Sequence, residues 1–98
     1  MNYSRKQIED FWQQLERTLD QLLSSQRDMQ FEADTLLSTY RNSLQKIDRN
    51  LTFHFEQESE AGPVEMIFGC DGYPESIHAV LSLVGAAPEL QGINFRAF

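Results

Sequence analysis

The distribution of glycine and proline divides this chain into two unlike halves. Residues 1–60 contain neither residue type, and all five glycines and three prolines lie between Gly62 and Gly92. The spacing of apolar side chains changes in the same region, passing near Asn50 from the period of a helix to the period of a strand. The sequence therefore predicts an α+β domain in which helices come first and a sheet with tight turns follows.

Two helices are predicted in the N-terminal half. The first spans residues 4–23 and begins at a capping box formed by Ser4 and Gln7. The second spans residues 26–48, with Ser25 and Asp28 spaced as another capping box. Each helix has one apolar stripe: Ile8, Phe11, Trp12, Leu15, Leu19, Leu22 and Leu23 in the first, and Met29, Ala33, Leu36, Leu37, Tyr40, Leu44 and Ile47 in the second.

These helices can be arranged in two ways. The apolar positions stay on roughly one seam from Ile8 to Ile47, so a single helix of about 66 Å that packs on a partner chain is one solution. In the other, the chain turns near residues 24–28 and forms an antiparallel hairpin. The hairpin is favoured because a compact domain must cover its sheet with these helices.

The C-terminal half predicts three strands and one helix. Alternating apolar residues mark strands at residues 51–57, 64–69 and 92–97, and the first two form a hairpin. Pro74 begins a helix over residues 74–86, and the last strand is expected to lie parallel to the second. The predicted fold is one domain over residues 1–98, in the order α-α-β-β-α-β, with two helices packed on a small three-stranded mixed sheet. The apolar face of the helix is predicted at Ile77, Val80, Leu81 and Val84.

The net charge of −7 is concentrated in the β-rich half. Residues 51–98 carry seven acidic side chains and one basic side chain, Arg96. Nucleic acids and anionic membranes are bound through Lys and Arg, so neither is an expected partner. The sequence contains no apolar run of about 20 residues and no apolar leader after Met1, which predicts a cytoplasmic protein. Its single cysteine, Cys70, excludes an intrachain disulfide.

Several segments form a recognisable pattern: Phe11-Trp12, Leu51 to Phe55, Asp71-Gly72, Leu83 to Gly92 and Ala97-Phe98. In these segments the chain resembles a family of uncharacterised bacterial proteins of unknown function. The resemblance covers most of the chain, and Ile93 stands where the family tends to have Trp. It implies the α+β fold and no particular activity or catalytic residue, and it implies that the chain is either an N-terminal portion of a longer protein or a trimmed relative.

The loop Gly69–Tyr73 is the candidate ligand site, with Asp71, Gly72 and Tyr73 as its residues. It lies between a strand and a helix, as phosphate-binding loops do, but it lacks their glycine spacing and their Lys, so a plain turn is favoured. Cys70 can be a nucleophile only with a base in reach, His54 or His78, and a buried apolar role is favoured. No catalytic residue, metal ligand or cofactor is assigned, because the candidate ligands Cys70, His54, His78, Asp71 and Glu65 follow no metal-binding spacing.

A protein-interaction module without enzymatic activity is the favoured function, and a ligand-binding or enzymatic domain that uses the Gly69–Tyr73 loop is the alternative. A protein partner or self-association is expected, the latter through the last strand or the first helix, because a three-stranded sheet has exposed edges. Phe11 and Trp12 are expected to be core anchors. The candidate partner-binding residues are Glu56, Glu58 and Glu60 around the predicted hairpin turn, and Phe98 at the chain end.

Overall fold

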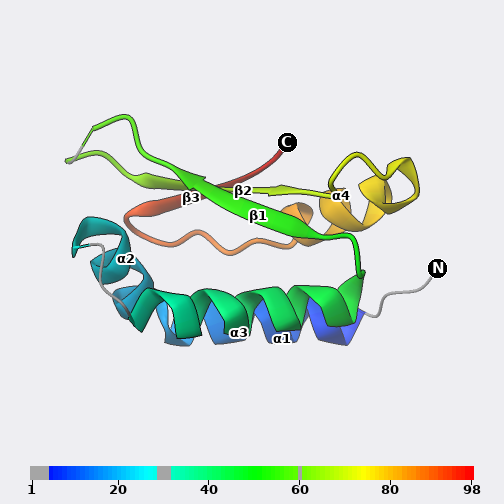
Figure 1. Cartoon of the computed structure of the whole chain (residues 1–98), viewed down its shortest axis with the longest axis horizontal. Helices are drawn as coiled ribbons and strands as arrows, with labels where there is room; N and C mark the ends of the chain where they lie inside the picture. The colour runs from blue at the N-terminus through cyan, green and yellow to red at the C-terminus, as the bar shows by residue number, and fades with distance from the viewer. Residues whose placement is uncertain (1–4, 29–31, 60) are drawn as a thin grey trace.

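The protein is a two-layer α+β structure, with a three-stranded mixed sheet on a layer of helices (Figure 1). This computed structural model describes residues 5–28, 32–59 and 61–98, and for 25–28 and 32–34 only their helical backbone. The α+β class and the mixed sheet are confirmed. The elements are α1 (Arg5–Arg17), α2 (Leu19–Asp28), α3 (Glu32–Ile47), β1 (Thr52–Glu56), β2 (Val64–Gly69), a 3₁₀ turn η1 (Pro74–Ser76), α4 (Ile77–Gly85) and β3 (Ile93–Ala97).

The first predicted helix, 4–23, is wrong as a single element, because it is broken at Thr18 into α1 and α2. The Thr18 hydroxyl donates to the carbonyl oxygen of Gln14 at 2.9 Å and shares a 2.6 Å hydrogen bond with the hydroxyl of Tyr40. A threonine bonded back to the preceding turn bends a helix. Beyond the bend, α2 rises from the helix layer toward the sheet (Figure 1). The order is therefore α-α-α-β-β-α-β, with one more helix than predicted.

The predicted antiparallel hairpin is present between α1 and α3, but α2 lies between them in the chain. Gln14 pairs with Ser43 at 2.6 Å and Thr18 pairs with Tyr40, so the two helices run in opposite directions. No helix begins at the predicted capping box of Ser25 and Asp28, because both residues belong to α2. A single long helix is wrong, since the longest dimension of the molecule is 38 Å.

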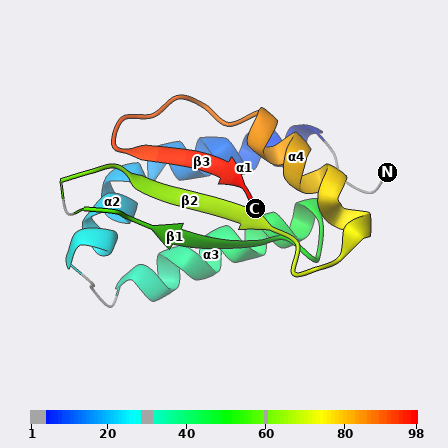
Figure 2. The same cartoon turned by 90° about the horizontal axis from the view of Figure 1, so that it is seen from above.

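The sheet has the strand order β1-β2-β3, with β1 antiparallel and β3 parallel to β2 (Figure 2). The strands begin and end within one residue of the predicted ranges. The connection from β2 back to β3 contains η1 and α4, so the predicted helix over 74–86 starts as a 3₁₀ turn. Gly92 enters β3 with a φ of 88°, a left-handed conformation that glycine adopts without strain.

The core lies between the sheet and the helix layer and is largely aromatic. Trp12 contacts the rings of Phe11, Phe68 and Phe95 at centroid distances of 5.0, 5.6 and 4.7 Å. Edge-to-face ring pairs of this kind stabilise a core beyond the area they bury. The apolar side of α1 is thus buried within this chain. Fully buried aliphatic residues around the rings include Leu15, Leu22, Leu44 and Met66.

Candidate functional site

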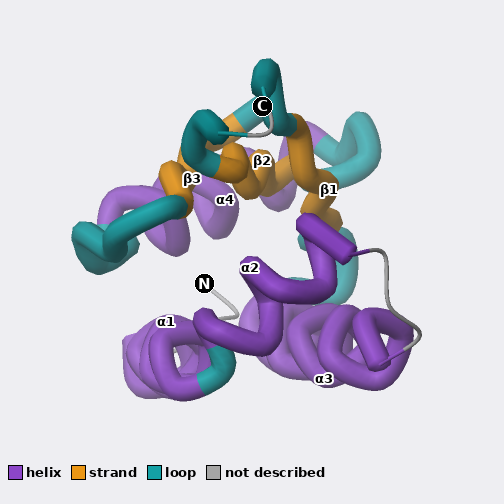
Figure 3. The backbone as a smooth tube through the Cα atoms, turned by 90° about the vertical axis from the view of Figure 1, so that its left-hand side faces the viewer, coloured by secondary structure: helices purple, strands orange, loops and turns teal. Residues whose placement is uncertain are grey.

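The outer face of the sheet is the side opposite the helix layer (Figure 3). The register aligns His54, Ile67 and Arg96 in one row and Glu56, Glu65 and Asn94 in the next, so most side chains of this face are polar. A guanidinium nitrogen of Arg96 lies 3.4 Å from a carboxylate oxygen of Glu56, and another lies 3.8 Å from one of Glu65. Ile67, on the middle strand between His54 and Arg96, is 2% exposed. The charged side chains of this face are therefore largely paired with one another, and such exposed pairs contribute little to stability.

Three of the four candidate partner-binding residues are described: Glu56 at the end of β1, Glu58 in the turn after it, and Phe98. Glu56 is engaged with Arg96 and, at 3.3 Å, with His54, whereas Glu58 is exposed in the turn after β1. Glu60 lies outside the described residues. Phe98 is 61% exposed at the chain end, where its N–H donates to the carbonyl oxygen of Phe68 at 2.8 Å. Phe98 is therefore available for contact. Of the acidic residues that are described, Glu56 is paired with Arg96 and His54, whereas Glu58 is exposed in the turn.

The loop after β2 is a tight turn in which two consecutive residues are left-handed. Asp71 and Gly72 have φ values of 54° and 79°, and the N–H of Tyr73 donates to the carbonyl oxygen of Cys70 at 3.0 Å. The glycine is required because such backbone angles are costly for most residues. The side chains of Asp71 and Tyr73 project from this turn and are exposed.

Cys70 does not have the surroundings of a nucleophile. It belongs to the buried core cluster, and its thiol donates to the carbonyl oxygen of Tyr73 at 3.1 Å. His54 lies on the outer face of the sheet and His78 on the exposed side of α4. In the parts of the chain that the structure describes, no three His, Cys, Asp or Glu side chains lie together as metal ligands.

A pocket of about 460 Å³ joins the loop to α3 and β1. Asp71 and Tyr73 line it, as the sequence analysis proposed for a ligand site, but Gly72 does not. Two arginines that also line the pocket were not predicted from the sequence: Arg41 on α3 and Arg49 in the turn after α3. The available signal was their spacing of eight residues, with Gln45 midway between them. Leu51, Thr52, Phe53 and Asn50 complete the lining.

The wall of this pocket is held by a polar network at the end of α3. The Ser76 hydroxyl donates to Oδ1 of Asp48 at 2.9 Å and accepts from Nδ2 of Asn50 at 3.0 Å. The Asn50 N–H also donates to the same Asp48 oxygen at 2.9 Å. Because Ser76 is only 1% exposed, these bonds are shielded from water and tie η1 to the end of α3.

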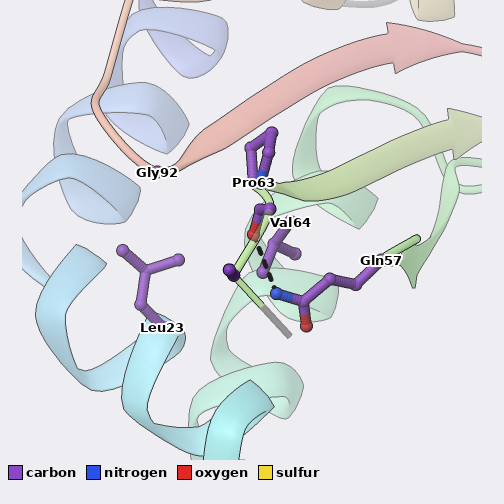
Figure 4. A pocket seen from close by; sticks show the side chains of 7 residues that line it. Leu23, Gln57, Pro63, Val64 and Gly92 are labelled. Carbon is purple, nitrogen blue, oxygen red and sulfur yellow. Dashed lines mark hydrogen bonds between the residues drawn. The ribbon is translucent and has the colours of Figure 1, made fainter. Parts of the chain in front are cut away.

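A second pocket, of about 310 Å³, lies where α2 meets the start of β2 (Figure 4). Leu23 faces Pro63, Val64 and Gly92 across it, and the side-chain amide of Gln57 donates to the carbonyl oxygen of Gly62 at 2.9 Å. Among the described residues, its lining holds no charged side chain, and the one polar side chain there, that of Gln57, is bonded to the backbone. This pocket offers a ligand little that would orient it.

The predicted apolar face of α4 is partly wrong. Val80 is fully buried, but Ile77 and Leu81 are 41% and 52% exposed. The buried positions are Ser76, Ala79, Val80 and Leu83, so the helix turns a different side toward the sheet. Ile77 and Leu81 lie one turn apart on the outward side. With Tyr73, which precedes the helix and is 47% exposed, they form what we term the α4 ridge: Tyr73, Ile77 and Leu81.

No family model, curated protein or solved structure matches this chain. Among the described residues, no helix is both long and apolar enough to cross a membrane.

Proposed function

We propose that this chain is a protein-interaction module and that the α4 ridge is its docking surface. One observation carries the proposal: three of the four large apolar side chains that are exposed in the described residues fall within residues 73–81. Single exposed apolar residues are ordinary, but a cluster on one helix is typical of a surface that another protein covers.

The α4 ridge resembles the helix side of a complex in which a helix docks into an apolar groove. Ile77 and Leu81 are spaced at i and i+4, as are the anchors of helices that dock in apolar grooves. Full burial of each side chain would contribute about 1.5–3 kcal/mol relative to exposure. Since both side chains are about half exposed, the gain available from each is smaller, and Tyr73 adds an aromatic contact at one end.

The charges of this part of the chain indicate the kind of partner. Glu75, between Tyr73 and Ile77, is exposed within η1, Glu89 is exposed in the loop after α4, and residues 51–95 contain no Lys or Arg. We therefore infer a different protein that presents an apolar groove edged by basic side chains. A second copy of the same ridge would bring these carboxylates together and is disfavoured by like-charge repulsion.

The test compares proteins captured from a native-host lysate by wild-type chain and by the double variant Ile77→Ser/Leu81→Ser. Phe98→Ser is the matched control, since Phe98 is exposed but lies at the other candidate contact. The captured partner is then purified, and its affinity is measured by calorimetry. We expect the double variant to weaken binding more than about 10-fold, and Phe98→Ser and wild type to bind alike.

Two results would overturn the proposal. If the double variant binds the purified partner as tightly as wild type, the ridge is not the docking surface, and loss of binding in Phe98→Ser alone would move the contact to the chain end. If sedimentation shows a dimer that only the double variant dissociates, the occupant of the ridge is a second copy of this chain. Glu75→Gln should weaken the complex and reduce its sensitivity to salt if the partner is basic.

A further inference from the structure

The pocket between α3, β1 and the Gly69–Tyr73 loop is a site of a different kind, although it shares Tyr73 with the α4 ridge. We propose that it binds a small molecule that carries an anionic group, a carboxylate or a phosphate, on a flat apolar body. The residues that bind the anion are Arg41 and Arg49, and the residues that contact the apolar body are Phe53 and Tyr73.

The lining of the pocket carries a net positive charge. Arg41 and Arg49 contribute two positive charges and Asp71 one negative charge, in a chain whose net charge is −7. Both arginines are exposed, and within the described residues neither has a carboxylate oxygen within ion-pair distance. Arg96 on the outer sheet face, by contrast, already lies beside two glutamates. A guanidinium without a protein carboxylate is free to pair with one from a ligand.

The polar side chains at the end of α3 add hydrogen-bond donors. Arg41 and Gln45 lie one turn apart on the same side of α3, and Arg49 lies in the turn just after the helix ends at Ile47. All three residues line the pocket. Thr52 adds a hydroxyl from β1 at the same pocket. These groups offer several hydrogen-bond donors to the oxygens of a carboxylate or a phosphate.

The apolar part of the lining suits a flat ring. The guanidinium of Arg41 lies 6.0 Å from the centre of the Phe53 ring, which places a cation beside an aromatic face. Leu51, which is 3% exposed, and Tyr73, which is 47% exposed, line the same pocket. A flat apolar group between Phe53 and Tyr73 would cover aromatic surface that now faces water.

Asp71 fixes the orientation of the ligand. Asp71 lines the pocket from the loop, whereas Arg41 lines it from α3 and Arg49 from the turn after α3. An anionic group is repelled by Asp71 and attracted by Arg41 and Arg49, so we expect it to lie beside the arginines rather than beside the loop. This predicts effects of opposite sign: removal of an arginine charge weakens binding, whereas removal of the Asp71 charge strengthens it.

The experiment is an NMR titration of the full chain with three probes: inorganic phosphate, phenyl phosphate and benzoate. The variants are Arg41→Gln, Arg49→Gln and Asp71→Asn. Lys46→Gln is the matched control, because Lys46 is an exposed cation on the same helix that borders the groove toward α1 instead. Amide shifts locate the probe, and their concentration dependence gives its affinity.

We expect at least one of the two aromatic probes to shift amides of residues 41–53 and 70–73. Each arginine variant should weaken that binding about 5- to 10-fold. Asp71→Asn should strengthen it about two- to fivefold. The choice between benzoate and phenyl phosphate identifies the anionic group.

Several results would overturn the proposal. If neither aromatic probe shifts these amides, the pocket does not bind such molecules. If Lys46→Gln weakens binding as much as the arginine variants do, the effect is one of net charge rather than of this pocket. If inorganic phosphate binds as tightly as phenyl phosphate, Phe53 and Tyr73 do not contact the ligand.

Discussion

The indole N–H of Trp12 donates a hydrogen bond to the carbonyl oxygen of Leu83 at 3.0 Å, across 71 positions of sequence. Leu83 lies in the last turn of α4, where backbone carbonyls have no partner within the helix. The same oxygen also accepts from the N–H of Ala86 at 3.2 Å. This contact joins the first and the last helix of the fold and sets how α4 lies against the sheet.

Trp12→Phe should lower the free energy of unfolding by about 1–3 kcal/mol, because it removes the hydrogen bond to Leu83 and leaves a small cavity among the aromatic rings. Gln13→Ala, an exposed change on the same helix, should alter stability by less than about 0.5 kcal/mol. Trp12 is the only tryptophan, so unfolding is followed by far-ultraviolet circular dichroism in urea. Equal stabilities of the two variants would show that the contact contributes nothing.

Leu81→Ala and Leu83→Ala should lower the free energy of unfolding by very different amounts, although the two residues are only two positions apart on α4. Leu83 is fully buried, so its truncation should cost about 2–5 kcal/mol. Leu81 is 52% exposed, and its truncation should change stability by less than about 1 kcal/mol. Urea unfolding of both variants is the measurement. A large cost for Leu81→Ala would mean that the helix turns its predicted side toward the sheet and that the α4 ridge does not exist.

Stability should fall as the pH rises above 10.0, in part because of Tyr40. Burial raises the pKa of Tyr40 above its ordinary value of 10.0, and its hydrogen bond with Thr18 lowers the pKa and only partly offsets that rise. Above pH 10.0 the unfolded chain releases the Tyr40 proton while the folded chain retains it. The folded state then binds more protons than the unfolded state, so the free energy of unfolding decreases with pH.

Tyr40→Phe supplies the comparison for this pH dependence. At neutral pH the variant should be less stable than wild type by about 1 kcal/mol, because the hydrogen bond with Thr18 is lost. That difference should shrink as the pH rises above 10.0, since the variant has no phenol to titrate at this position. Urea unfolding across this pH range is the measurement, and parallel curves for the two proteins would contradict the assignment to Tyr40.

Much of the candidate site was beyond reach of the sequence. Asp71 and Tyr73 were proposed as ligand residues from the turn chemistry of Gly69–Tyr73, and both do line a pocket. Arg41 and Arg49 were not proposed, because nothing in the sequence around these two arginines shows that the Gly69–Tyr73 loop packs beside them. The prediction that Ile77 and Leu81 face the core was wrong for a related reason. A helix with apolar residues on more than one side does not show by its sequence which side packs on the sheet.

Local backbone geometry could be read directly from the order of residues, because helix and strand periods are properties of neighbouring positions. The α+β class, the β1–β2 hairpin and the parallel return of β3 follow from that pattern together with chain connectivity. Tertiary packing decided the rest. Thr18, where the helix bends, is hydrogen-bonded to Tyr40 of α3. The end of α4 is hydrogen-bonded to Trp12 of α1. The pocket forms where α3 and the Gly69–Tyr73 loop lie together. Each of these is a contact between segments that are far apart in the sequence. Such a contact forms only in the folded chain, so the local pattern of residues does not reveal it.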